Sequence, residues 1–174
     1  MARAMTTQAD LIRSDLSRLP LRALAALLAR GAKRHRPQFD LPGDTPDRAE
    51  HMNAVDKAIR IVWEYAKGGD FPEAAAQELA TGGLSAACVG PGNAFGIPAH
   101  KAAMAIGAVF AALYMTHETA IDRALQSIQS DGLEAQMVRQ DYEKLRGLGL
   151  GTFPDPGQPI DPASLGPMWP EDHI

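Results

Sequence analysis

The run MNAVDKAIRIVWEYA, residues 52–66, carries the clearest periodic pattern of the chain. Its apolar residues recur at steps that return to one side of an α-helix: Met52, Val55, Ile59, Val62, Trp63 and Ala66. Because a helix turns once in about 3.6 residues, this spacing predicts an amphipathic helix with one buried stripe. Residues 45–47, Thr-Pro-Asp, predict its start through a capping side chain, a first-turn proline and an early carboxylate. Gly68 and Gly69 predict its end.

Two further helices are predicted before this stretch. Thr7 is suited to cap a first helix over residues 8–19. Pro20 suits the first position of a second helix over residues 21–34, because the N–H that it lacks would have no partner there. Pro37 then ends the second helix. One face of this helix gathers four leucines: Leu21, Leu24, Leu27 and Leu28.

Three helices are predicted after it. A short Ala-rich helix covers residues 72–80, and the longest helix covers residues 98–130. Residues 102–115 are apolar on nearly every side, which is typical of a helix at the centre of a bundle. This stretch is too short for a membrane span of about 20 residues. Asp131 and Glu134 resemble a capping box and predict the start of a last helix.

These elements predict an all-α protein. We expect an irregular bundle of about five or six helices around the central helix 98–130, with an extended Pro-rich C-terminal strap. Aromatic residues make up only 6% of the chain, so small side chains fill much of the core and favour closely packed helices. We divide the chain into a basic N-terminal helical arm (1–36), a helical core (37–148) and a Pro/Gly-rich tail (149–174), which together form one domain.

The tail combines helix-breaking residues with large apolar ones. Six prolines and five glycines follow residue 146, which excludes a regular helix. Apolar side chains nevertheless recur along it, and a purely solvated segment rarely carries them. We therefore interpret the tail as a strap whose side chains fill grooves on the core or on a partner protein. The candidate partner-binding residues are Phe153, Leu165, Met168 and Trp169.

The C-terminal part also resembles a known group of proteins. The runs Asp141-Tyr142-Glu143-Lys144-Leu145, Leu148-Gly149-Leu150-Gly151 and Phe153-Pro154, with Pro159-Ile160-Asp161-Pro162 and Leu165-Gly166-Pro167-Met168-Trp169-Pro170, carry this resemblance. They are similar to the C-terminal ends of small Ala-rich helical proteins from planctomycete-type bacteria. The resemblance covers residues 141–170 and implies no activity. It supports only the expectation that the tail belongs to the domain.

Charge divides the chain into two parts. Residues 1–36 hold eight lysines and arginines against two aspartates, a net charge of +6, and the remaining residues carry −10. The basic segment 18–36 is therefore a candidate for contact with a nucleic acid or another polyanion, which would be salt-dependent. The candidate residues are Arg30, Lys33, Arg34 and Arg36. The same charges also suit docking on the acidic body, and a small anion could bind near residues 90–101 at a helix start.

A metal site or enzyme is a further alternative. His117 and Glu118 begin like a zinc-protease motif, but Ile121 stands where the second histidine is required. Glu118 and Asp122 would share one helical face and could bind a divalent ion only with ligands from another helix. The loop before residue 98 lacks the residues of a nucleotide-binding loop. We therefore assign no catalytic residue and no cofactor.

The leading hypothesis is a non-enzymatic helical protein that binds other protein chains, and a homo-oligomer is one form of this. Nucleic-acid binding through residues 18–36 and metal or enzyme chemistry on the helix face 117–122 remain the alternatives. A single cysteine permits no intramolecular disulfide, and this agrees with a reducing, cytoplasmic location. We expect no association with a membrane.

Overall fold

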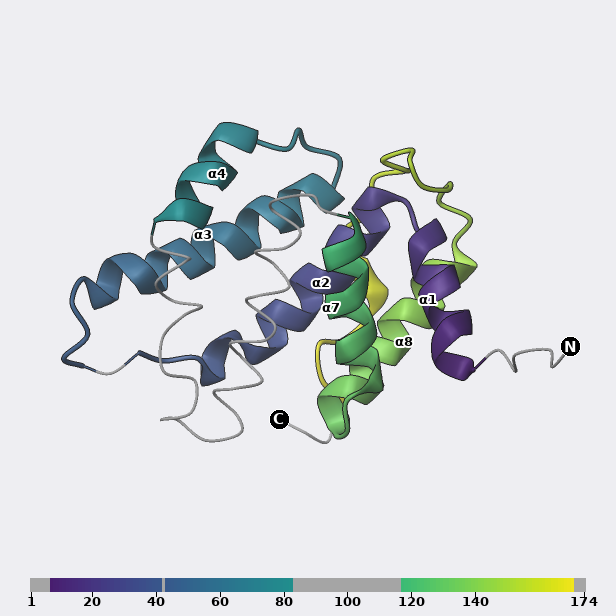
Figure 1. The fold of residues 1–174 in the computed structure, drawn as a ribbon, viewed down its shortest axis with the longest axis horizontal. Coiled ribbons are helices and arrows are strands. Elements are labelled where there is room, and N and C mark those ends of the chain that lie inside the picture. The colour runs from purple at the N-terminus through teal and green to yellow at the C-terminus, as the bar shows by residue number, and fades with distance from the viewer. Residues whose placement is uncertain (1–6, 42, 83–116, 171–174) are drawn as a thin grey trace, which may run out of the picture.

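The computed structural model describes residues 7–41, 43–82 and 117–170 (Figure 1). The expected all-α class is confirmed, because these ranges contain six α-helices and two short 3-10 helices but no strand. The α-helices are α1 (Gln8–Arg18), α2 (Leu21–His35), α3 (Arg48–Ala66), α4 (Glu73–Thr81), α7 (His117–Gln129) and α8 (Leu133–Gly147). The 3-10 helices are η1 (Arg36–Gln38) and η3 (Pro162–Leu165). The predicted central stretch 102–115 and the loop at 90–101 lie outside the described residues.

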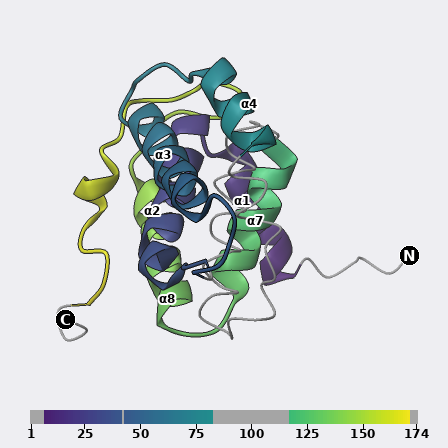
Figure 2. The same ribbon diagram turned by 90° about the vertical axis from the view of Figure 1, so that its left-hand side faces the viewer.

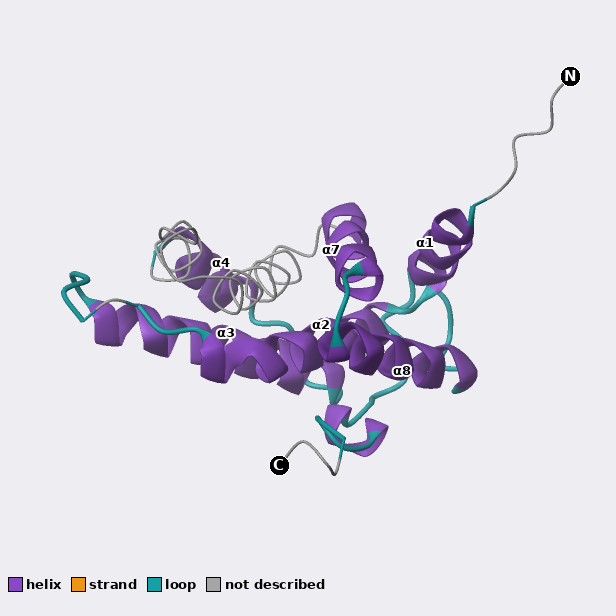
Figure 3. Ribbon diagram, turned by 90° about the horizontal axis from the view of Figure 1, so that it is seen from below, coloured by secondary structure: helices purple, strands orange, loops and turns teal. Residues whose placement is uncertain are grey.

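The described helices form two layers. One layer contains α3, α2 and α8, and the other contains α4, α7 and α1 (Figures 2 and 3). The C-terminal strap, with η3, lies on the outer side of the first layer (Figure 3). No helix in the three described ranges has both the length and the apolar character that a membrane crossing requires.

Helix α2 occupies the middle of the described bundle and contacts α3, α7 and α8. The sequence predicted that a helix over residues 98–130 would lie at the centre of the bundle. Of these residues, the structure describes only those from His117 onward, which form α7. Four alanines of α2 have no exposed surface, and such small side chains let neighbouring helices approach closely: Ala23, Ala26, Ala29 and Ala32. Leu24, Leu27 and Leu28 of the predicted face are buried beside them, and Leu21, its fourth leucine, is half-buried.

Helix α3 confirms the predicted apolar stripe but begins two residues later than its start signal indicates. Val55, Ile59 and Val62 are buried on the face towards the core. Asp47 adopts a φ of 52° in the left-handed region and has no side-chain capping bond, so the predicted cap at residues 45–47 is wrong. Arg48 is held there instead, because its Nε donates to the Leu41 carbonyl at 2.7 Å.

The first and last helices differ in how they begin. The predicted cap of α1 is confirmed: Thr7 Oγ1 accepts a hydrogen bond from the Asp10 amide at 3.2 Å. The Asp10 carboxylate accepts one from the Thr7 amide at 2.9 Å, which completes a capping box. Helix α8 begins after Gly132, whose φ is 105°, and has no side-chain capping bond. Asp131 is therefore not its cap.

The strap supplies hydrogen-bond partners to the ends of three helices. A helix end leaves backbone groups without helical partners, and these must be satisfied elsewhere. The Phe153 amide donates to the Arg18 carbonyl at the end of α1 at 3.0 Å. The Pro156 carbonyl accepts from the Arg22 amide near the start of α2 at 2.9 Å. The Ile160 amide donates to the Ala66 carbonyl at the end of α3 at 2.8 Å. Residues 153–160 thus lie directly on the helical core.

Candidate functional site

Two arginines from α2 meet one aspartate from α8 inside the protein. Arg30, Arg34 and Asp141 are 0%, 2% and 1% exposed. Arg30 Nε donates to Asp141 Oδ2 at 2.9 Å, and Arg34 Nη1 lies 2.7 Å from the same oxygen. Burial lowers the pKa of the Arg34 guanidinium, and the hydrogen bond to Asp141 opposes that change. The buried Asp141 carboxylate therefore forms ion pairs with two buried guanidinium groups.

The same arginines bind the strap through its backbone. Arg30 reaches three carbonyl oxygens around η3 at 2.6, 3.1 and 3.0 Å: those of Pro162, Gly166 and Pro167. Arg34 Nε donates to the Met168 carbonyl at 2.8 Å. Lys144 of α8 donates to the Leu165 carbonyl. We call this arrangement the strap clasp: Arg30, Arg34, Asp141 and Lys144 with the strap carbonyls of residues 162–168.

The clasp changes the interpretation of the basic segment. Arg30 and Arg34 were candidates for polyanion contact because they lie in the basic segment 18–36. In the structure both are buried and occupied by the strap and Asp141, so neither guanidinium is accessible to a polyanion in this fold. Of the four candidates, Lys33 is exposed and Arg36 is partly exposed.

The four candidate partner-binding residues of the strap lie in different environments. Leu165 is 3% exposed and belongs to the core, so its side chain is not available to a partner in this conformation. The Phe153 ring stacks on the His117 ring with 3.6 Å between centroids. Met168 and Trp169 remain partly exposed. Sequence alone could not separate these residues, because all four have the same apolar, Pro-rich context.

The candidate metal residues at the start of α7 have other partners. Arg13 of α1 forms ion pairs with Glu118, at 3.1 Å, and with Asp122. The hydrogen bond that Arg13 donates to Asp122 is the main reason that the pKa of Arg13 is raised. His117 is stacked on Phe153, and burial lowers the pKa of its imidazole. Within the described ranges, no group of three or more metal-binding side chains occurs.

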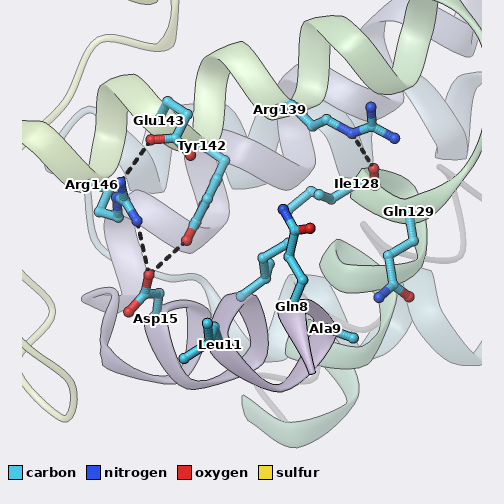
Figure 4. Close-up of a pocket in the computed structure, with 11 residues that line it drawn as sticks. Gln8, Ala9, Leu11, Asp15, Ile128, Gln129, Arg139, Tyr142, Glu143 and Arg146 are labelled. Carbon is cyan, nitrogen blue, oxygen red and sulfur yellow. Dashed lines mark hydrogen bonds and ion pairs between the residues drawn. The ribbon is translucent and has the colours of Figure 1, made fainter. Parts of the chain in front are cut away.

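An open groove lies between α1 and α8, next to the end of α7 (Figure 4). Its volume is about 700 Å³. The α1 side is mainly apolar, and Leu11 is 57% exposed there. The residues that line the groove are Gln8, Ala9, Leu11, Ile12 and Asp15 of α1, Ile128 and Gln129 of α7, and Arg139, Tyr142, Glu143 and Arg146 of α8. We call it the α1–α8 groove.

A hydrogen-bonded network fixes one end of this groove (Figure 4). Asp15 Oδ2 accepts from the Tyr142 hydroxyl at 3.0 Å and from Arg146 Nη1 at 3.1 Å, and Arg146 also pairs with Glu143 at 3.0 Å. The Tyr142 hydrogen bond, followed by that of Arg146, lowers the pKa of Asp15. Burial, followed by Asp15, raises the pKa of Tyr142 to about 12. The two helices are therefore joined by polar contacts at this end of the groove.

The other end of the groove is positioned by Arg139, whose Nε donates to the Ile128 carbonyl at 2.7 Å. This contact satisfies a carbonyl near the end of α7 and holds α7 beside α8. This groove could not be predicted from the sequence, because its walls come from helices at opposite ends of the chain. Leu11 gave no separate signal, since an exposed leucine is common on an amphipathic helix.

Comparisons of this chain with protein-family models, with curated proteins and with solved structures found no match in any of the three. The fold and its sites therefore carry the functional argument by themselves.

Proposed function

We propose that this is a non-enzymatic helical protein that acts by binding protein chains, and that one of these chains is a second copy of itself. The observation that supports this proposal is the α1–α8 groove with the exposed Leu11 on its edge. A large apolar side chain on the apolar α1 side of the groove is suited to insert into the same groove on another molecule. Two-fold dimers, the commonest homo-oligomers, bury one patch against itself in this way.

The charges of the groove favour a second copy as its occupant. Arg139 and Arg146 are its cations, and Asp15 and Glu143 are its anions. A patch with both signs in equal number can be complementary to itself when a two-fold axis reverses it, whereas a patch of one sign repels its copy. In the proposed dimer, Leu11 of each copy enters the groove of the other.

The pairing of the acidic groups supports a binding role over a metal-dependent one. Glu118 and Asp122 could act as ligands only if both left Arg13. Each of these surface pairs stabilises the protein by about 0–1 kcal/mol. The ion pairs therefore favour the present arrangement only weakly. The strap clasp likewise supports protein binding over nucleic-acid binding, because two of the four candidate cations, Arg30 and Arg34, are buried.

The test is the molar mass in solution over a series of protein concentrations. We expect a dimer whose dissociation constant rises by about tenfold or more when Leu11 is changed to Arg, since the large apolar side chain that enters the groove of the other copy is then lost. Leu148→Arg is the matched control, because Leu148 is 55% exposed but does not line the groove. A wild-type protein that stays monomeric at high concentration would refute the proposal, as would an equal effect of both substitutions.

A further inference from the structure

A second groove lies between α2 and α3, at the C-terminal end of α2, and its volume is about 450 Å³. It is lined by Lys33, Arg36 and Pro37 on one side and by Asp56, Ile59, Arg60 and Trp63 of α3 on the other. We call it the α2–α3 groove. It shares no lining residue with the α1–α8 groove.

The floor of the α2–α3 groove combines an aromatic ring with a cation. Lys33 Nζ lies 4.4 Å from the centroid of the Trp63 ring, within the range of a cation–π contact. Ile59 and Pro37 add apolar surface to the same lining. Lys33 is itself exposed, so its ammonium can leave the ring for another partner without unfolding any element.

The charge of this groove is positive. Arg36 binds the Asp56 carboxylate through Nε at 2.6 Å and Nη2 at 2.9 Å, and this forked pair neutralises the only carboxylate among the described lining residues. Lys33 and Arg60 are the other two cations among the described lining residues. No carboxylate within the described ranges forms an ion pair with either of them. Among the described residues, two cations without an ion-pair partner thus belong to the lining of this groove, on a chain whose net charge is −4.

These features exclude some occupants and favour one. A long nucleic acid is typically bound by an extended basic stripe, and here the burial of Arg30 and Arg34 interrupts that stripe. A purely ionic ligand would leave the apolar floor unused. We infer that the α2–α3 groove binds an acidic segment of a partner protein that carries one large apolar side chain. The apolar side chain lies against Trp63, and flanking carboxylates pair with Lys33 and Arg60.

Fluorescence anisotropy with the full-length protein and a fluorescein-labelled peptide, Glu-Glu-Gly-Leu-Phe-Gly-Glu-Glu, tests this inference. We expect saturable binding that weakens with salt, because surface ion pairs are screened. The double variant Lys33→Gln with Arg60→Gln should weaken binding by about tenfold or more. Lys57→Gln is the matched control, because Lys57 is an exposed cation of α3 that does not line the groove. Circular dichroism confirms that each variant is folded.

Two further probes decide between occupants. A peptide with serines in place of Leu-Phe should bind at least about fivefold more weakly, since it cannot cover the apolar floor. An oligothymidylate of equal charge should bind more weakly than the acidic peptide. Equal binding of the serine peptide, tighter binding of the oligothymidylate, or no binding of the Leu-Phe peptide would each overturn the inference. Leu11→Arg should leave peptide binding unchanged, so this result is independent of the proposed dimer.

Discussion

Asp141 illustrates how one residue far along the chain determines the environment of others. It is separated by 111 positions from Arg30, yet its carboxylate lies against both buried guanidinium groups. The sequence prediction treated Arg30 and Arg34 as candidates for contact with a polyanion, which requires both at the surface. The pattern along α2 could not reveal their burial, because the groups that contact their guanidinium groups come from α8 and the strap.

Removal of the Asp141 charge should destabilise the fold strongly. In Asp141→Asn the side chain keeps its size but leaves two buried cations without an anion, and such a loss costs about 3–5 kcal/mol. We expect a decrease of at least about 3 kcal/mol in the free energy of unfolding, measured by urea denaturation. Glu143→Gln on the same helix is the control, because Glu143 has a 56% exposed side chain in a surface pair with Arg146. A change below about 1 kcal/mol for Asp141→Asn would contradict the clasp.

At the scale of elements, the strap fits the core only where its backbone can approach closely. Gly157 has a φ of 85°, and a Cβ atom there would lie 2.5 Å from Pro20 Cβ and 3.1 Å from the Leu150 carbonyl oxygen. Both the left-handed backbone and the crowding require glycine at this position. The strap could not pass over the start of α2 with a side chain there.

Gly157→Ala should therefore destabilise the protein by about 1–3 kcal/mol, through backbone strain and the clash with Pro20. Gly147→Ala is the control: no atom lies within 4 Å of its added Cβ, and Gly147 is the last residue of α8. That substitution should be neutral or stabilising by about 0.5 kcal/mol, because alanine favours the helix. Thermal unfolding of both variants provides the comparison, and equal effects would argue against close contact between strap and core.

Elements differ in how well the sequence predicted them. The stripe of α3 was predictable because its period is local, and the start of α1 was predictable because Thr7 lies next to the groups that it caps. The start of α3 was not, because Arg48 is positioned by the Leu41 carbonyl and Asp40 rather than by its own neighbours. Both grooves were missed for the same reason, since each is formed between two helices.

For the whole molecule, the central claim is that the C-terminal strap is an integral part of the fold. Its backbone forms hydrogen bonds with three helix ends, and its carbonyl groups accept hydrogen bonds from the two buried arginines of α2. Ile160 is the clearest reporter, because it is 5% exposed and its amide donates to the Ala66 carbonyl at 2.8 Å. An appended tail would not show either property.

The most direct measurement of this claim is native-state amide hydrogen exchange at Ile160, compared with a buried amide of α2 such as that of Leu27. If the strap folds together with the core, both amides exchange only through global opening, and both have nearly the same protection. Asp141→Asn should then reduce the two protection factors together. Exchange of the Ile160 amide at the rate of an unstructured peptide, while Leu27 stays protected, would contradict the account.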